Sequence, residues 1–363
     1  MKILRNYVVA EHVSPFLVTL GGLTAVLLLG NILKFGELVV AKGVSIIDLL
    51  RLLIYLVPSL FSFTLPMACL VAMVLAFGRL NTDFELIAMR ASGVSPARLI
   101  PPMVMLGLIL SMILVVLNDR VIPASHLAYR RQLKAIGIKQ PAAYLEAGTF
   151  MKDFPPYIIF VYQVHGTTLH DIRIYEPQAN GPTRTIIASR GEFERIPGKR
   201  GVQLKLYNGS ADEWNQENPL AFYKIGFSTY VMNLHSEQDD PERLGKKLKE
   251  MTFGELIQER RKLAVQDIET FPVSLELHRK IASAFAPLIF ILFGLNFGLR
   301  LQRYERLMTY VWVLALFIGY YLAGIGMNAV ALKGWMTPAV SMWVPNIFAA
   351  TVASVLLAET VRR

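Results

Sequence analysis

The segment "LAFGRLNTDFELIAMRASGVSPARL" (residues 75–99) joins two apolar runs and carries helix signals of its own. Thr82 followed by Glu85 matches a capping box, in which the hydroxyl accepts from the third backbone N–H and the carboxylate reaches back to the cap. Gly93 predicts the end of the element, because glycine adopts the left-handed conformation that closes many helices. We therefore predict a short helix over residues 82–92 rather than a simple turn.

This predicted helix has one apolar face, because four small or apolar side chains recur at the i, i+3, i+4 and i+7 positions. Charged side chains occupy the remaining surface. An element with an apolar face needs something to pack against, and we expect it to contact either the membrane domain or another protein. The apolar positions are Phe84, Ile87, Ala88 and Ala91, and the charged ones include Glu85 and Arg90.

Composition places the chain in a membrane. Hydrophobic residues make up 54% of the 363 residues and charged residues only 18%, whereas soluble domains carry about 25% charged residues. Cys69 is the one cysteine, so the chain forms no internal disulfide and no thiolate metal site. Much of the net charge of +10 flanks apolar runs, where membrane orientation and lipid headgroups explain it better than nucleic acid does.

Six apolar runs are long enough to cross a bilayer, which takes roughly 20 residues. The first run is too long for a cleaved signal peptide, and no small-residue cleavage site follows it. We therefore predict a multi-pass protein with three spans before a long insert and three after it. The runs cover residues 13–34, 49–77, 99–117, 281–299, 308–332 and 338–358.

The lysines and arginines of the short loops predict the orientation, because such residues accumulate on the cytoplasmic side. With both termini inside, the cytoplasmic loops hold Lys2, Arg5, Arg79, Arg90, Arg98, Arg300, Arg303, Arg306, Arg362 and Arg363. The outer short loops hold little more than Lys34, Lys42, Arg51 and Lys333. The helix at 82–92 is then cytoplasmic, and the insert lies on the other face of the membrane.

The insert contains short runs rich in Ile, Val, Tyr, Phe and Thr, which predict an antiparallel β-sandwich or jelly roll. Apolar side chains on both faces of several strands indicate either an ordinary two-layer core or a face that lines something else. A second capping box at Thr252 and Glu255 opens an amphipathic helix that leads to the fourth span. The predicted strands cover residues 157–164, 171–176, 184–196, 202–214 and 221–234.

Several kinds of chemistry are missing from the sequence. The phosphate loop G-x-x-x-x-G-K-[ST] does not occur, so the chain does not hydrolyse ATP by that route. The interiors of the six predicted spans contain no charged residue or histidine, and the nearest charges, such as Lys34 and Arg51, lie at their ends, which argues against a self-powered carrier. The histidines show no metal-ligand spacing, and we expect no metal or cofactor. The polar residues within or beside the spans that we interpret as interhelical hydrogen bonds are Asn296, Asn328 and Asn346.

Cations near the predicted outer ends of the spans are candidate lipid ligands. A lysine at a helix end usually extends to the headgroups and does nothing more, and arginines beyond a span are usually solvated. The alternative is that these groups meet the phosphates of an amphiphile from the outer leaflet. The candidates are Lys34, Lys42, Arg120 and Arg131, with Arg130 and Lys134 nearby.

The chain resembles a known family, the permease subunits of the lipopolysaccharide export transporter of the LptF/LptG (YjgP/YjgQ) type. The resemblance covers essentially the whole chain. It is carried by the segment at residues 75–99, by "LHRKIASAFAPLIFILFGLNFGLR" (277–300) at the fourth span, and by "LKGWMTPAVSMWVPN" (332–346) before the sixth. The resemblance implies three spans, an extracytoplasmic β-jelly roll and three further spans. The tandem tyrosines at 320–321 favour the F-type, although "LKF" at 33–35 looks more like the G-type.

The resemblance also implies partners. Two such permeases form a heterodimer, two cytoplasmic ATPase subunits drive it, and lipopolysaccharide enters from the outer leaflet of the inner membrane. A bitopic partner and the jelly rolls form a periplasmic bridge toward the outer membrane. In that family the helix after the second span is the coupling helix, and the carboxylate at the position of Glu85 enters a groove of the ATPase. Lys34 occupies the place of a lysine that contacts the lipid phosphates.

Three domains follow: residues 1–117 with the coupling helix 82–92, residues 118–278 with the jelly roll, and residues 279–363. We expect an ABC-transporter permease for lipopolysaccharide and no catalytic residues. The alternatives are a scaffold that anchors a periplasmic β domain, and a secondary lipid carrier driven by an ion gradient. The residues expected to contact the ATPase are Asp83, Phe84, Glu85, Ile87, Ala88 and Arg90.

Overall fold

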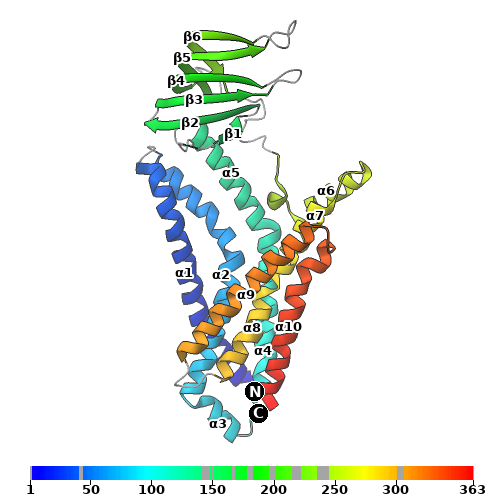
Figure 1. The fold of residues 1–363 in the computed structure, drawn as a ribbon. Helices are drawn as coiled ribbons and strands as arrows, with labels where there is room; N and C mark the ends of the chain where they lie inside the picture. The colour runs from blue at the N-terminus through cyan, green and yellow to red at the C-terminus, as the bar shows by residue number, and fades with distance from the viewer. Residues whose placement is uncertain are drawn as a thin grey trace. The chain divides into compact units, whose positions relative to one another are not determined.

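The computed structural model describes residues 2–40, 44–139, 148, 150–154, 156–165, 168–177, 183–195, 202–214, 222–234, 245–300 and 306–362. The chain divides into two compact units (Figure 1). One unit contains Met1–Gly30, Tyr55–Leu127 and Lys246–Arg363, and the other contains Asn31–Ile54 and Ala128–Gly245.

Helices dominate the chain on both sides of the insert. Within the described ranges, six helical stretches are long and apolar enough to cross a membrane, which confirms the predicted spans. The helices are α1 (Lys2–Val40), α2 (Ile46–Thr82), α3 (Glu85–Ala91), α4 (Ile100–Val116), α5 (Ile122–Lys139), α6 (Phe253–Val265), α7 (Phe271–Ala284), α8 (Ala286–Arg300), α9 (Arg306–Leu332) and α10 (Pro338–Arg362).

The third and fourth spans extend furthest beyond their predicted apolar runs. The third continues from α4 through a π-helical turn at Leu117–Val121 into α5, and the spanning stretch covers Ala97–Ile136. The fourth covers Phe271–Arg300 and is interrupted at Phe285, between α7 and α8. Pro287 explains the interruption, because proline has no N–H to donate to the preceding turn.

Glycines bring α8 close to α2. A Cβ on Gly294 would lie 2.6 Å from Met73 Cβ, and one on Gly298 would lie 2.5 Å from Phe77 Cβ. The two glycines are four residues apart, which places them on one face of α8. Small residues at this spacing let helix backbones approach closely in membranes.

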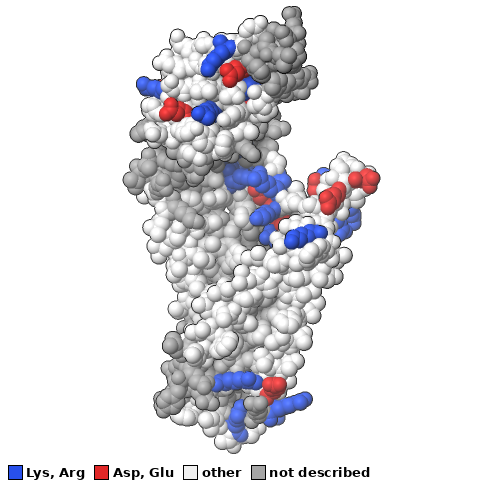
Figure 2. Space-filling view, in the orientation of Figure 1, with Lys and Arg blue, Asp and Glu red and all other residues white. Residues whose placement is uncertain are grey.

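Buried asparagines join the helices of the first unit. Asn296 Nδ2 donates to Ala353 O at 3.0 Å, and Asn346 Nδ2 donates to Ala282 O at 2.7 Å. Both bonds join different helices, which confirms the interpretation of these two residues. On the visible face of this unit, Lys and Arg lie at both ends and a band without charged side chains separates them (Figure 2).

The second unit contains the predicted β insert, which is confirmed. Six antiparallel strands form one sheet in sequential order: β1 (Phe150–Phe154), β2 (Tyr157–His165), β3 (Thr168–Glu176), β4 (Arg184–Arg195), β5 (Val202–Trp214) and β6 (Phe222–Asn233). Five correspond to the predicted strands, and β1 is additional. The described strands follow one another up and down, and the two-layer order of a jelly roll is not seen among them.

A bend crosses this sheet. Asp171 on β3 and Asn208 on β5 both have positive φ angles, 51° and 50°, which Asp and Asn tolerate better than most residues do. On β3, Ile172 and Ile174 are buried on one side of Asp171 and Leu169 on the other, so the inward alternation shifts by one residue there. One sheet can thereby enclose an apolar core, whose fully buried members include Ile159.

The ends of three helices complete the second unit. Val44, Leu52 and Ile136 are buried together, and Gln132 Nε2 donates to Asp48 Oδ1 at 2.8 Å. The beginning of α2 and the α5 helix are therefore held together by both apolar and polar contacts.

Candidate functional site

The α3 helix begins differently from the prediction. Thr82 is not its cap: it belongs to the last turn of α2, and its Oγ1 donates to Gly78 O at 2.8 Å. The N-terminal flank of α3 is Phe84, which has a left-handed backbone (φ 61°) and provides no side-chain cap. The predicted capping box with Glu85 is therefore wrong, because a hydroxyl inside a helix can bond its own i−4 carbonyl instead.

The end of α3 agrees with the prediction. Gly93 has φ +77°, and its N–H donates to Arg90 O at 3.0 Å. The N–H of Val94 donates to Met89 O at 2.9 Å, which satisfies another terminal carbonyl. Ser95 then accepts from Ala97 N and begins the next turn. Both ends of α3 are thus fixed by the backbone, and the connection between the second and third spans is a defined element.

The two faces of α3 have different surroundings. Leu86 is buried in a core with Leu80 and Leu99, so this face packs onto the membrane helices. The predicted apolar face is exposed: Phe84 is 61% exposed and Ile87 is 54% exposed. Ala88 and Ala91 are exposed beside them. The α3 helix therefore presents an apolar surface that no described part of the chain covers, and we call Phe84, Ile87, Ala88 and Ala91 the outer face of α3.

Glu85 forms hydrogen bonds with Tyr7, near the beginning of α1. The hydroxyl of Tyr7 donates to both carboxylate oxygens of Glu85, at 3.1 and 2.9 Å. Nearby, Arg79 Nη2 donates to Glu11 Oε1 at 3.0 Å, and Arg79 Nε lies 3.8 Å from Asp83 Oδ2. Tyr7 and Glu11 were not predicted, because they lie more than 65 residues from their partners and no local spacing indicates them.

This arrangement is suited to docking. Within the described ranges, no group of three or more His, Cys, Asp or Glu could hold a metal ion. The outer face of α3 combines exposed apolar side chains with the charges of Asp83, Glu85 and Arg90 at its edges. Apolar anchors edged by charges are typical of protein interfaces.

The candidate lipid ligands fall in different parts of the chain. Lys42 lies outside the described residues. Lys34 lies on α1, but its side chain is among those that are not described. Arg131 is half-buried on α5 in the second unit. Arg120 is exposed in the first unit, and its Nε lies 3.8 Å from Asp119 Oδ2.

Asn118, which lies on the third span, connects it to two other spans. Asn118 Nδ2 donates to Lys280 O at 2.9 Å, and Asn118 Oδ1 accepts from Ser62 Oγ at 3.2 Å. Asn118 is buried in the π-helical turn, and π-helical turns are frequent at functional sites. It directly follows the third apolar run, and no role was predicted for it from the sequence.

Two comparisons with known proteins bear on this chain. A family model described as "Lipopolysaccharide export system permease LptF/LptG" matches residues 6–359. An uncharacterized protein of Rickettsia prowazekii (strain Madrid E) is 21% identical over 237 residues. That alignment covers 65% of this chain and 64% of the relative, so it spans a little less than two thirds of the relative's length.

Proposed function

Because the chain belongs to the lipopolysaccharide export system permease family LptF/LptG, we propose that it extracts lipopolysaccharide from the inner membrane and passes it to a periplasmic bridge. The family is one of transport permeases, not of enzymes. In the proposed complex a separate ATPase hydrolyses ATP, which accords with the missing phosphate loop in this sequence. The family model covers both types of permease, so the F-type assignment stays a prediction.

The observation that carries this proposal is the outer face of α3. Its apolar side chains are exposed on an element whose opposite face is packed onto the membrane helices through Leu86. An ATPase bound there would push or pull directly on the second and third spans. We propose that Phe84, Ile87 and Ala88 supply the apolar contact and that Asp83, Glu85 and Arg90 supply the polar one.

The proposed orientation places α3 and both termini in the cytoplasm and the β sheet in the periplasm. Its support is the excess of lysine and arginine in the loops on the α3 side. Within the first unit, the termini lie at the same end as α3 (Figure 1). The periplasmic bridge partner would then meet the second unit.

We also propose a sister permease, an ATPase dimer and a bitopic bridge protein as partners. The spanning windows of Ile3–Leu33 and Met308–Leu332 are each only 6% buried within the chain. Apolar helices with so little cover from their own chain are available to a second membrane protein or to lipid. A heterodimer that encloses a lipid cavity would use such helices.

The docking proposal is tested with substitutions on the outer face of α3. We expect Ile87→Asp to detach the ATPase, because it puts a charge in the proposed apolar contact. Glu85→Ala should uncouple ATP hydrolysis from lipid release or weaken the complex. The measurements are copurification of the ATPase and lipopolysaccharide release from proteoliposomes.

The matched control is Ile268→Asp. Ile268 is 51% exposed, compared with 54% for Ile87, and it lies between α6 and α7. This variant tests whether any exposed aspartate disturbs the complex. Normal copurification and release with Ile87→Asp and Glu85→Ala would refute the docking site, and a purified complex without any ATPase would favour the scaffold.

The lipid path is tested separately at Lys34. We propose that Lys34, Lys42, Arg120 and Arg131 contact the phosphates of lipopolysaccharide. Lys34→Asp should reduce photocrosslinking to lipopolysaccharide more than it reduces assembly, because it reverses a charge at the proposed contact. Lys333→Asp is the control, because it reverses the charge of another predicted outer-loop lysine, on the α9–α10 turn. Lys333 Nζ lies 5.2 Å from the centroid of the Trp335 ring. Equal crosslinking in wild type and Lys34→Asp would leave Lys34 as a lysine that only reaches the headgroups.

A further inference from the structure

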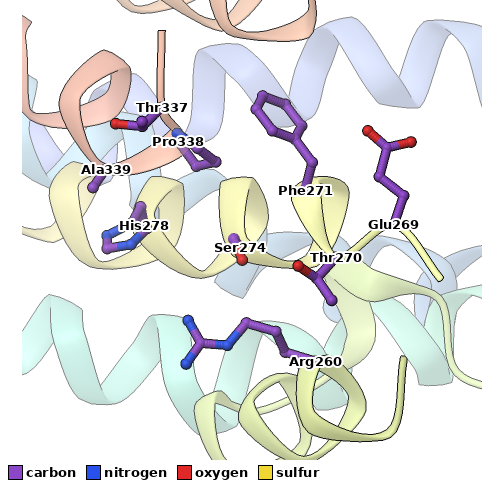
Figure 3. Close-up of a pocket in the computed structure, with 9 residues that line it drawn as sticks. All are labelled: Arg260, Glu269, Thr270, Phe271, Ser274, His278, Thr337, Pro338 and Ala339. Carbon is purple, nitrogen blue, oxygen red and sulfur yellow. The ribbon is translucent and has the colours of Figure 1, made fainter. Parts of the chain in front are cut away.

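A cleft of about 380 Å³ lies in the first unit between α6, α7 and the beginning of α10 (Figure 3). It is at the end of the helical unit opposite α3 (Figure 1). Its volume falls in the range of about 300–1,000 Å³ that is usual for small-ligand sites. Its polar lining residues are Arg260, Glu269, Thr270, Ser274, His278 and Thr337.

The lining favours an anion. Figure 3 shows the guanidinium of Arg260 facing the side of α7 that carries Ser274 and His278. Among the described residues, no carboxylate forms an ion pair with Arg260, and Figure 3 shows the carboxylate of Glu269 directed away from it. Within the described part of the chain, the cation and the imidazole of this cleft therefore form no ion pair with a carboxylate.

Several hydroxyl groups add to these donors. Thr270 and Ser274 are half-buried on or beside α7, and Thr337 immediately precedes Pro338, the first residue of α10. The beginning of a 25-residue helix carries a partial positive charge. A guanidinium, an imidazole and hydroxyl donors around one space match the several acceptor oxygens of a phosphate group.

The surroundings of the cleft are those of a membrane interface. The spanning stretches Phe271–Arg300 and Pro338–Thr360 both begin at the cleft. Val265 (88% exposed) lies at the end of α6, and Trp335 (73% exposed) lies on the turn before α10. Exposed tryptophan and aliphatic side chains at the ends of spans are typical of the headgroup level of a bilayer.

We propose that this cleft binds the phosphate of an anionic phospholipid from the surrounding leaflet. The lipid stays with the protein and is distinct from the transported cargo, so the inference goes beyond the proposed function. Arg260 and His278 hold the phosphate, and the hydroxyls of Ser274 and Thr337 complete the donor set. Val265 and Trp335 lie where the acyl chains would leave the headgroup.

Native mass spectrometry of the purified full-length complex tests the proposal. The probes are phosphatidylglycerol and phosphatidylcholine, each added after delipidation. We expect the wild type to retain phosphatidylglycerol at least about tenfold more strongly, and Arg260→Ala to lose this preference, which corresponds to about 1.4 kcal/mol. Arg260→Lys should recover part of it, because the charge remains while the bidentate geometry does not.

The matched control is Arg261→Ala. Arg261 is exposed on the same helix and does not line the cleft. If Arg261→Ala and Arg260→Ala reduce retention equally, or if the wild type shows no preference, the proposal is wrong. Both arginine variants change exposed side chains, so folding is not at risk.

Two competition measurements distinguish a phospholipid from the other possible sources of the bound phosphate. Inorganic phosphate is added to the complex loaded with phosphatidylglycerol. Retention of the lipid supports a lipid site, whereas displacement by phosphate alone overturns it in favour of a free-anion site. Lipopolysaccharide is added in the same way, and its replacement of phosphatidylglycerol in an Arg260-dependent manner would overturn the distinction between resident lipid and cargo.

Discussion

His12 is a buried polar side chain without a described partner. It is 1% exposed on α1, and neither ring nitrogen has a hydrogen-bond partner among the described residues. Its ring stacks on Phe16, with the centroids 6.0 Å apart. A buried polar group without a partner costs about 1–3 kcal/mol, so His12 lowers the stability of this helix packing.

We therefore expect His12→Leu to stabilise the chain by about 1 kcal/mol, because it removes the unsatisfied nitrogens and keeps an apolar contact. The measurement is resistance of the purified protein to unfolding in mixed micelles with increasing sodium dodecyl sulfate. The control is His12→Gln, which stays polar and should be no more stable than the wild type. A His12→Leu protein less stable than His12→Gln would show that the ring has a partner outside the described residues.

Glu85 shows how one residue can have two contacts. In the single chain it accepts from Tyr7, and in the proposed complex it meets the ATPase. The sequence could indicate that a carboxylate stands at the edge of the apolar face. It could not indicate Tyr7, because that contact joins two helices that only the packed bundle brings together.

At the scale of the element, an observed capping box stabilises the beginning of α6. Thr252 Oγ1 accepts from Glu255 N at 3.3 Å, and the carboxylate of Glu255 accepts from Thr252 N at 2.9 Å. The same carboxylate pairs with Lys246. The hydrogen bond from Lys246, followed by the bond from the Thr252 backbone, lowers the pKa of Glu255.

This lowered pKa predicts the pH dependence of α6. A carboxyl group with a lower pKa in the folded state contributes stability above its ordinary pKa and loses it as the pH falls through the folded value. Hydrogen exchange of the α6 amides should therefore accelerate in acid, beyond the intrinsic effect of pH. Glu255→Gln should make α6 less protected at neutral pH and remove the additional acid effect. An acid profile identical in wild type and Glu255→Gln would contradict the assigned cause.

The two Thr-x-x-Glu motifs of the chain have different outcomes for a structural reason. The 3-10 turn before Thr252 ends at Glu250, and Met251 and Thr252 are both extended, so the side chain of Thr252 is free to cap. Thr82 follows 36 residues of the same helix, since α2 runs from Ile46 to Thr82 over 37 residues. The motif alone does not distinguish these two cases, because it contains no information on whether the preceding helix has ended.

At the scale of the whole molecule, the contact between α2 and α8 joins the two halves of the membrane domain. Gly294 and Gly298 lie against Met73 and Phe77, with no room for a further carbon atom. We expect Gly294→Ala or Gly298→Ala to destabilise the chain by about 1–3 kcal/mol, because the helices must separate. Unfolding in mixed micelles measures this change.

The control for this prediction is Gly254→Ala on α6. A Cβ on Gly254 would meet nothing within 4 Å. Alanine is favoured over glycine in a helix by roughly 0.5–1 kcal/mol, so this variant should be neutral or slightly more stable. If all three alanine variants behave alike, the close approach of α2 and α8 does not contribute to stability.

The sequence by itself determined the presence of the six spans, five of the inserted strands and the end of α3. These features depend on local quantities: the length of an apolar run, the alternation within a strand and the backbone freedom of Gly93. The G-x-x-x-G spacing at Gly294 and Gly298 was also present in the sequence, although only the packed structure shows that α2 is its partner.

Only the tertiary structure decided which face of α3 is covered, what holds Glu85, and how a single bent sheet encloses its core. The apolar pattern of α3 left open whether Phe84 and Ile87 contact the membrane domain or another protein, and in the structure the buried residue is Leu86. The reason is that the left-handed residue Phe84 sets the direction in which α3 leaves α2, and that direction selects the covered face. Local pattern fixes the faces of an element, whereas long-range contacts fix which face the rest of the molecule covers.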